Sequence, residues 1–274
     1  MALNFREYTP EDLEHLHELE IMILNDMITV LERNDIPYFA YGGTHIGAVR
    51  HEGFIPWDDD VDIVLFREDY EKAIDVFSKE LDPEKYEVLS PKLIDDCFYL
   101  FSMVSLKGTK YAFWYRDYVS YNVGIHIDFF ALDNVPDSDF KCKIYYYKTR
   151  ILNHLQTNAI IDMKHSKIHH LIHKVLKILP ISNQKWKEYT YNAITKYNNQ
   201  ETKRVADAGE ISGFFAFDRD GFKPAVKTKF ENIEVAIPKS DKILVQLFGD
   251  YMQIPPPEKR KNHAPRILEF GDEL

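Results

Sequence analysis

The sequence has little cysteine and no long apolar run, and these absences exclude several classes of protein. Of 274 residues only Cys97 and Cys142 are cysteines, and they form no CxxC pair. A disulfide framework or thiolate zinc site is therefore not expected, and two reduced, buried thiols in a cytosolic protein are the favoured interpretation. No window reaches 18 apolar residues, so no transmembrane helix is predicted. The first residues, MALNFREYTPEDLEHL, lack the apolar region of a signal peptide.

Positive charge is also scarce, which argues against a generic nucleic-acid binder. The chain has 34 Lys and Arg against 44 Asp and Glu, a net charge of −10, whereas nucleic-acid-binding domains are usually basic. The distribution is uneven: residues 141–200 hold 11 Lys or Arg and two Asp or Glu, so they carry +9 and the rest −19. This asymmetry marks 141–200 as a separate unit. We predict a core domain over 1–140, a basic helical insert over 141–200, and a segment over 201–274 that completes the core.

The spacing of apolar residues predicts an α/β architecture for the core. Thr9 and Pro10 form a helix-start signal, and the apolar period that follows ends near Asn34. The turn-like run Asp133-Asn134-Val135-Pro136 should close the last strand of the first half. Further helices are expected over 44–50, 68–81, most of 141–200 and 240–248, and strands over 38–41, 61–66, 86–90, 98–106, 111–116, 124–130 and 233–237.

The stretch GGTHIGAVRHEGFIPWDDDVDIVLF, residues 42–66, places three adjacent carboxylates ahead of a predicted strand. Asp60 and Asp62 point to the same face of that strand, roughly 6.5 Å apart, so they could share divalent cations. Asp128 lies in an otherwise apolar strand, where a carboxylate is costly unless it is paired or binds metal. Oxygen ligands favour Mg²⁺ or Mn²⁺. An EF-hand is excluded, because Ile63 occupies the position that needs glycine.

The residues Gly42-Gly43-Thr44 stand between a predicted strand and a predicted helix. A glycine turn there lets backbone N–H groups approach a phosphate at the helix N-terminus. Neither a Walker A motif nor GxGxxG is present, so this signal is weak by itself. An ordinary tight turn and a solvated acidic loop are the alternative interpretations.

Three segments resemble one known family. The stretch GGTHIGAVRHEGFIPWDDDVDI, the later GIHIDFFALDNVP and the distal FGDYMQIPPPEKR are similar to the LicD family of phosphocholine transferases, distantly related to fukutin-type phosphosugar transferases. The similarity covers most of residues 1–135 and about 230–262. It implies a nucleotidyltransferase-like mixed sheet core flanked by helices, with a helical insert.

The resemblance also implies roles for the acidic residues. Asp60, Asp62 and Asp128 would be the catalytic, metal-binding carboxylates, and Asp58 could support the metal. Asp59 is expected at the surface.

The substrate-binding residues implied by the resemblance begin with the phosphate turn, Gly42, Gly43 and Thr44. The strand before Lys107 lacks a basic residue that the family often carries there. A phosphate contact is therefore expected from Arg50, Lys107 or Lys110. An ion pair between Arg50 and Glu52 is an equally open alternative. His126 and Trp57 are interpreted as packing residues.

The function implied is metal-dependent transfer of phosphocholine, or a similar phosphoalcohol, from a CDP-activated donor to a hydroxyl of a cell-surface glycan precursor. The acceptor could be lipid-linked, as in teichoic acid or lipopolysaccharide modification, and the location is expected to be cytoplasmic. The residues by themselves indicate only metal-assisted phosphoryl chemistry. Two rivals therefore stay open: a nucleotidyltransferase that uses an NTP and releases pyrophosphate, and a non-catalytic binding protein with a relic site.

The basic insert raises two further questions. His165, His169 and His173 lie four residues apart on one predicted helix face, where a polar surface is favoured over a zinc site. Residues 166–180, SKIHHLIHKVLKILP, combine an apolar stripe with lysines. Such a helix either packs on the acidic core, which is slightly favoured, or lies on the inner face of an anionic membrane. The stripe consists of Ile168, Leu171, Ile172, Val175, Leu176 and Leu179.

Overall fold

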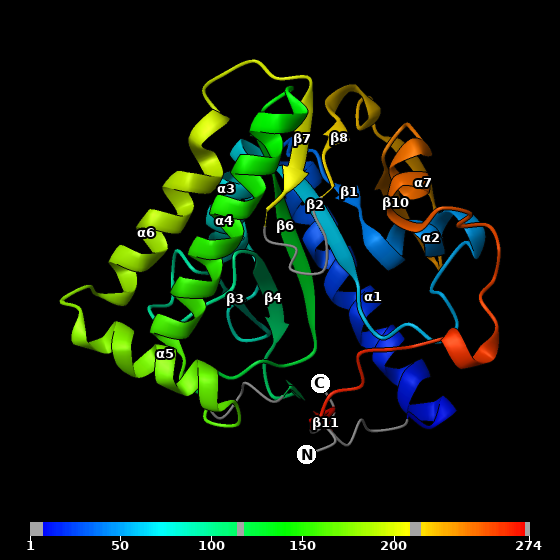
Figure 1. The fold of residues 1–274 in the computed structure, drawn as a ribbon. Coiled ribbons are helices and arrows are strands. Elements are labelled where there is room, and N and C mark those ends of the chain that lie inside the picture. The colour runs from blue at the N-terminus through cyan, green and yellow to red at the C-terminus, as the bar shows by residue number, and fades with distance from the viewer. Residues whose placement is uncertain (1–7, 114–117, 209–214, 272–274) are drawn as a thin grey trace.

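Helices and strands alternate as far as residue 89, three more strands follow, and then three helices (Figure 1). The computed structural model describes residues 8–113, 118–208 and 215–271. Its helices are α1 Pro10–Arg33, α2 Gly42–Arg50, α3 Arg67–Glu80, α4 Asp139–Ile160, α5 Lys167–Ile178, α6 Asn183–Ile194 and α7 Lys242–Phe248. Its strands are β1 Phe39–Ala40, β2 Asp62–Phe66, β3 Tyr86–Leu89, β4 Ser102–Leu106, β5 Lys110–Ala112, β6 His126–Val135, β7 Arg204–Asp207, β8 Phe217–Asp218, β9 Val226–Phe230, β10 Ile233–Ile237 and β11 Ile267–Glu269.

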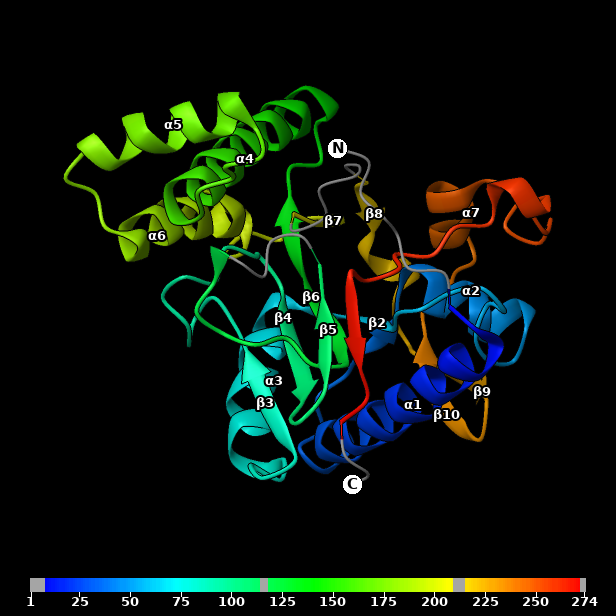
Figure 2. The same ribbon diagram turned by 90° about the horizontal axis from the view of Figure 1, so that it is seen from below.

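A seven-stranded mixed sheet forms the centre of the molecule. Its main path runs β1-β2-β6-β4-β3, and β7 and β8 extend it from the far half of β6. Strands β2 and β6 are parallel, and the other neighbours are antiparallel. Two small sheets, β9–β10 and β5–β11, join the distal part of the chain to the core (Figure 2). The predicted mixed α/β fold is confirmed.

Helix α1 has the sequence signals expected of it. The Thr9 side chain accepts a hydrogen bond from the Asp12 backbone N–H, Pro10 occupies the first turn, and the helix ends at the Asn34 cap. Its apolar face packs against α3 and β6. One buried member of that face, Glu20, is acidic and is only 2% exposed.

Strand β6 is longer than the sequence predicted. The expected turn at residues 133–136 is wrong, since Asp133, Asn134 and Val135 continue the strand. They pair with β7, which arrives from about 70 residues later in the chain. Asp133 is fully buried because Arg67 forms an ion pair with it at 2.7 Å. The turn-forming composition was overridden by this long-range pairing.

Residues 139–194 fold into α4, α5 and α6, which lie together on one side of the sheet, while α2 and α7 lie on the other (Figure 1). Helix α4 packs chiefly on α6 and α5. The mainly helical character predicted for this segment is confirmed. Both cysteines are free and buried, as expected.

Candidate active site

Strands β2 and β6 bring together the acidic residues singled out in the sequence. Asp62 and Asp128 are direct partners in the parallel register, and the Asp128 backbone N–H donates to the Val61 carbonyl at 3.1 Å. Side chains at paired positions point to the same face of a sheet. Asp60, Asp62 and Asp128 line one cavity of about 320 Å³.

The N-terminus of α2 lies against the acidic loop, and its glycines make this approach possible. Gly42 has a φ of +54°, and a Cβ on it would lie 3.1 Å from Asp62 Oδ2. A Cβ on Gly43 would lie 2.3 Å from Asp58 Oδ2. The Thr44 hydroxyl accepts a hydrogen bond from the Asp62 backbone N–H at 2.8 Å. These residues therefore hold the carboxylates in position, next to the positive end of α2.

Asp59 is not at the surface, and that expectation is wrong. Its side chain is fully buried and accepts hydrogen bonds from the Tyr8 hydroxyl, the Tyr111 hydroxyl and the backbone N–H groups of His263 and Ala264, at 2.7 to 3.1 Å. Although burial raises its pKa, the hydrogen bonds from His263 and Tyr8 bring the pKa of Asp59 below the usual value. Asp59 thus joins the segment before α1, β5 and the distal segment.

Glu20 is a further acidic residue of the site that the sequence analysis missed. It projects from α1 into the same cavity, and its Oε2 is buried without a hydrogen-bond partner. Burial, followed by the charges of Asp60, Asp59 and Asp58, raises the pKa of Glu20 well above its ordinary value. The available signal was its place in the apolar stripe of α1, between Leu16 and Ile23.

Asp128 faces a neutral histidine. Burial lowers the pKa of His126 to about 4, and its Nδ1 lies 2.8 Å from the Gly124 carbonyl oxygen. A carbonyl can only accept, so Nδ1 carries the proton and Nε2 presents a lone pair. That Nε2 lies 3.5 Å from Asp128 Oδ1, which is buried without a hydrogen bond. Two acceptors face each other favourably only with a proton or cation between them.

The raised pKa values of the clustered carboxylates also indicate that the site holds protons or a cation. Burial, with the charge of Asp60 adding to it, raises the pKa of Asp128 well above its ordinary range. Burial and the charges of Asp60 and Asp59 raise the pKa of Asp58 to about 8. Crowded carboxylates of this kind are stabilised by a bound cation. The residues present therefore fit a divalent metal.

His263 supplies a nitrogen to this cluster and was also missed. Its Nδ1 lies 3.1 Å from Asp60 Oδ2 and 3.3 Å from Asp59 Oδ1. Asp59, Asp60 and His263 offer ligand atoms that all lie within 4.8 Å of one another, so they could hold a metal ion. The hydrogen bond to Asp59, followed by the charge of Asp60, raises the pKa of His263 to about 9. As an imidazolium it partly neutralises the loop. Nothing in the local sequence distinguishes it, because strand pairing of β11 brings this segment to the site.

Arg50 and Lys107, both predicted to contact substrate, use their side chains elsewhere. Arg50 donates to the Tyr251 carbonyl and to the His51 ring. Lys107 donates to the Pro83 carbonyl at 2.6 Å. Neither lines the cavity that holds the carboxylates. Lys110 instead pairs with Glu269.

Aromatic side chains form the wall of the cavity beside the carboxylates. Tyr99, Phe101, Phe113 and Phe130 line it together with Tyr111. The ring centre of Phe101 lies 4.7 Å from those of both Tyr99 and Phe130. An acidic floor thus adjoins an aromatic wall, which suits a ligand with a positively charged apolar group.

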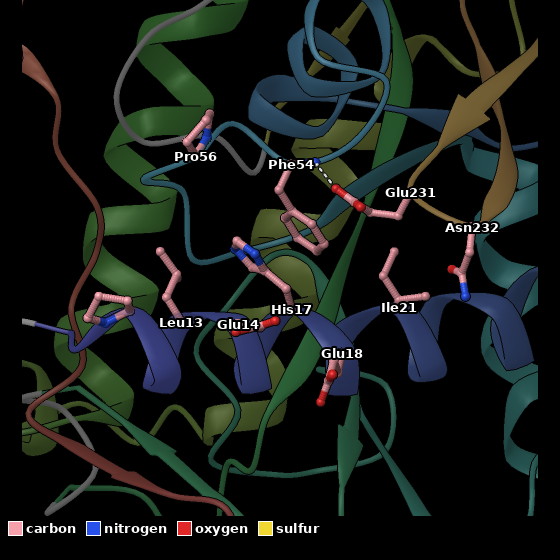
Figure 3. Close-up of a pocket in the computed structure, with 10 residues that line it drawn as sticks. Leu13, Glu14, His17, Glu18, Ile21, Phe54, Pro56, Glu231 and Asn232 are labelled. Atoms are coloured by element: carbon pink, nitrogen blue, oxygen red, sulfur yellow. Dashed lines mark hydrogen bonds between the residues drawn. The ribbon is translucent and has the colours of Figure 1, made fainter.

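A larger cavity of about 900 Å³ lies along another face of α1 (Figure 3). His17 stacks on Phe54 with ring centres 3.7 Å apart, and Glu231 accepts from the Phe54 backbone N–H at 2.9 Å. The His17 Nε2 lies 2.8 Å from the Asp58 carbonyl oxygen, so this wall supports the acidic loop from outside. The smaller cavity is the better candidate active site, since it holds the clustered carboxylates.

The predicted row of three histidines is not on one helix, because His165 precedes α5 while His169 and His173 lie within it. His173 Nδ1 lies 2.7 Å from the Asn158 carbonyl oxygen, and the His165 ring lies 6.4 Å from that of Tyr118. Among the residues that the structure describes, the one cluster of three or more metal-ligating side chains is at Asp60, not here. In the same part of the chain, every helix is too short or too polar to cross a membrane.

Comparison with known proteins agrees with this geometry. Residues 35–154 match the LicD/FKTN/FKRP nucleotidyltransferase domain. The chain is 26% identical over 266 residues to the lipopolysaccharide cholinephosphotransferase LicD of Haemophilus influenzae, which covers 90% of this chain and 95% of that protein. Human ribitol 5-phosphate transferase FKRP is 44% identical over 43 residues, 16% of this chain and 9% of that protein. Residues 35–154 thus form a domain of the LicD/FKTN/FKRP nucleotidyltransferase type, and this similarity indicates a transferase of the phosphotransferase type.

Proposed function

We propose that the protein transfers phosphocholine from CDP-choline to a hydroxyl of a cell-surface glycan precursor. The observation that carries this proposal is the cavity in which Asp60, Asp62 and Asp128 meet an aromatic wall. The long relative from Haemophilus influenzae is named for transfer of cholinephosphate to lipopolysaccharide, which supports both donor and acceptor class. The reaction is placed in the cytoplasm, where the acceptor would be a lipid-linked glycan precursor.

Mg²⁺ or Mn²⁺ would be held by Asp60, Asp62 and Asp128, with Asp58 in support. Bound there, such an ion neutralises negative charge on the donor phosphates and on the departing nucleotide. Glu20 lies at the same cluster and extends its ligand set. His263 would join that set only by giving up its proton as the ion binds. The unpartnered oxygens of Glu20 and Asp128 are the structural support for this cation.

The residues of the cavity then have separable tasks. Gly42, Gly43 and Thr44 fix the acidic loop against α2, where the donor phosphates would lie beside the helix N-terminus. In the reaction, the acceptor oxygen forms a bond to the phosphorus of phosphocholine as the bond from that phosphorus to the CMP oxygen breaks. The proton of the acceptor hydroxyl passes to a carboxylate of the cluster, and CMP leaves with the bridging oxygen.

The aromatic wall favours choline over the other alcohols carried by such donors. A trimethylammonium group cannot donate hydrogen bonds, so aromatic faces bind it better than polar side chains do. Phe101 and Phe130 offer these faces within the cavity. A polyol such as ribitol would instead need hydrogen-bonding partners for its hydroxyls.

The test is product analysis with purified protein, Mg²⁺ or Mn²⁺, and CDP-choline, CDP-ethanolamine, CDP-glycerol or CDP-ribitol. CMP should form, depend on the metal and be fastest with CDP-choline. Pyrophosphate released from an NTP, without CMP formation, would support the nucleotidyltransferase rival. Binding of a CDP-alcohol without any turnover would support a relic site.

A further inference from the structure

The helical segment after β6 exposes many large apolar side chains. Of the 18 exposed large hydrophobic side chains in the described residues, ten lie between residues 141 and 200. This is more than half of them in less than a quarter of the chain. The same segment carries the net charge of +9. Exposed apolar groups that gather in this way indicate an interaction surface.

Helix α5 shows the pattern most clearly. Ile168, Leu171, Val175 and Ile178 are 71%, 63%, 53% and 81% exposed, and their spacing places them on one helix face. Of the apolar stripe predicted from the sequence, Leu176 alone is buried, against Ala159 and Trp186. Packing on the protein's own core therefore accounts for a minor part of the stripe.

The orientation of α5 is fixed from its other side. His170 pairs with Asp162 at 2.6 Å, and His173 contacts the Asn158 carbonyl at the end of α4. These contacts hold one face of α5 against α4. The face with Leu171 and Val175 is left turned to solvent.

Positive charge borders the exposed face. Residues 163–180 contain no Asp or Glu, and their lysines are Lys164, Lys167, Lys174 and Lys177. All four are exposed. Lysines keep their ammonium groups in the headgroup layer while their stems cover apolar surface. A helix with aliphatic residues on one side and lysines along the border fits an anionic lipid surface.

We propose that the exposed face of α5, defined by Ile168, Leu171, Val175 and Ile178 with the bordering lysines, binds the surface of an anionic membrane. A second copy of the chain would bring the same positive segment to the contact, which is unfavourable. A protein partner is less suited, because binding hot spots are rich in Trp, Tyr and Arg rather than in exposed Leu and Val. The lipid surface satisfies both the charge and the aliphatic character.

The experiment is co-sedimentation of the full chain with vesicles of phosphatidylcholine alone or mixed with phosphatidylglycerol. Binding should require phosphatidylglycerol and weaken as salt rises. Each lysine near such a surface strengthens binding about fivefold. Lys167→Glu combined with Lys174→Glu should therefore weaken binding by about 25-fold or more. Leu171→Ser combined with Val175→Ser should remove the binding that remains at high salt.

Helix α7 and the residues just before it offer a matched control, because exposed lysines lie there beside exposed apolar residues. Lys239→Glu with Lys242→Glu, and Val245→Ser with Phe248→Ser, should leave vesicle binding unchanged. All these side chains are exposed, so each variant should fold, which circular dichroism checks. CMP release with a soluble acceptor should be preserved in every variant.

Several outcomes would overturn the proposal. These are equal retention on both kinds of vesicle, the same loss of binding in the α7 and α5 variants, or no binding at low salt. If the α5 variants instead convert a dimer to a monomer in size-exclusion chromatography with light scattering, the face belongs to a protein–protein contact. Failure of any CDP-alcohol to turn over would leave these binding results unaffected.

Discussion

The sheet core and the helical segment 139–194 both depart from the usual rule of apolar side chains inside and charged ones outside, but in opposite ways. The core buries polar groups: Glu20, Asp59 and Asp133 are 2% exposed or less. The helical segment does the reverse and exposes aliphatic side chains such as Leu171 and Ile178. Buried acids and exposed aliphatics are each unfavourable without a partner. Asp59 and Asp133 find their partners within the chain, whereas a Glu20 oxygen and the exposed face of α5 have none among the described residues. The comparison therefore supports the two proposals made above, a cation at the first region and a lipid surface at the second.

The largest effect should come from breaking the acidic site. Asp62→Asn and Asp128→Asn each remove a charged ligand, which should cost about a thousandfold in kcat/KM while the chain stays folded. CMP release measures this, on whichever CDP-alcohol the protein uses. Asp250→Asn, in an exposed turn, is the control and should be fully active. Normal turnover by Asp62→Asn would remove Asp62 from the site.

The next effect is on the free energy of unfolding, and it compares a fully buried carboxylate with a half-buried one. Asp59→Asn replaces one of the two acceptor oxygens by an NH₂ group and leaves buried donors unpaired. This should lower the free energy of unfolding by about 3 kcal/mol. Asp162→Asn breaks the half-buried pair with His170 and should change that free energy much less. Urea unfolding compares the two. Equal losses of unfolding free energy in the two variants would mean that the buried hydrogen bonds of Asp59 do not stabilise the fold more than the Asp162 pair does.

Stability of the metal-free core should fall as pH rises. The pKa of Asp58 is raised to about 8 and that of His263 to about 9, so these two groups hold more protons in the folded state than in the unfolded state between pH 4 and 9. Their contribution to stability is then full at low pH and is lost as pH passes through these values. The lowered pKa of His126 acts oppositely below about pH 6.5, so the fall in stability is expected above that pH. Asp59 acts oppositely, because its lowered pKa makes its contribution present above about pH 4 and lost below it.

Urea unfolding in EDTA at several pH values measures this trend. Adding Mg²⁺ or Mn²⁺ should restore stability, and more strongly at pH 8 than at pH 5, because deprotonated carboxylates bind the ion. A metal effect independent of pH would contradict the assignment of these residues to a cation site.

A smaller effect is expected at the aromatic wall. Phe101→Leu keeps an apolar side chain but removes a π face, so kcat/KM for CDP-choline should fall about tenfold. The value for CDP-glycerol should change little. Phe140→Leu, at a 73% exposed position outside this cavity, is the control. If Phe101→Leu lowers kcat/KM equally for both donors, the wall acts in packing and does not select choline.

The smallest effect should be on the stability of the helical segment. Leu171→Ser with Val175→Ser should change the free energy of unfolding by about 0.5 kcal/mol or less, since both side chains are already in water. Ile63→Ala, at a fully buried position of β2, should cost about 2–5 kcal/mol. A large loss in the α5 variant would show that its exposed face supports the fold.

The sequence predicted the parts of the fold that depend on local chemistry. The start of α1 at Pro10, its end at Asn34, and strand β2 were all predicted from caps and apolar spacing. The strand β6 was predicted too short, because its last residues look like a turn until β7 pairs with them. Local propensity cannot report a partner that lies about 70 residues away.

The candidate site likewise contains residues that the sequence predicted and residues that it did not. Alternation along β2 predicted that Asp60 and Asp62 share a face, and the apolar setting of Asp128 marked it as unusual. Glu20 left only a weak signal, as an acid inside the apolar stripe of α1. His263 left none, and Asp59 was assigned to the surface although its donors come from Tyr8 and from residues 263 and 264.

By itself the sequence determined the periodic helices and strands, the acidic loop after the glycine turn, and the separation of charge between 141–200 and the rest. These are consequences of neighbours along the chain. Tertiary structure alone decided which carboxylates are buried together and which face of α5 is left in solvent. Burial and electrostatic coupling depend on distance in space, and strand pairing and helix packing set those distances.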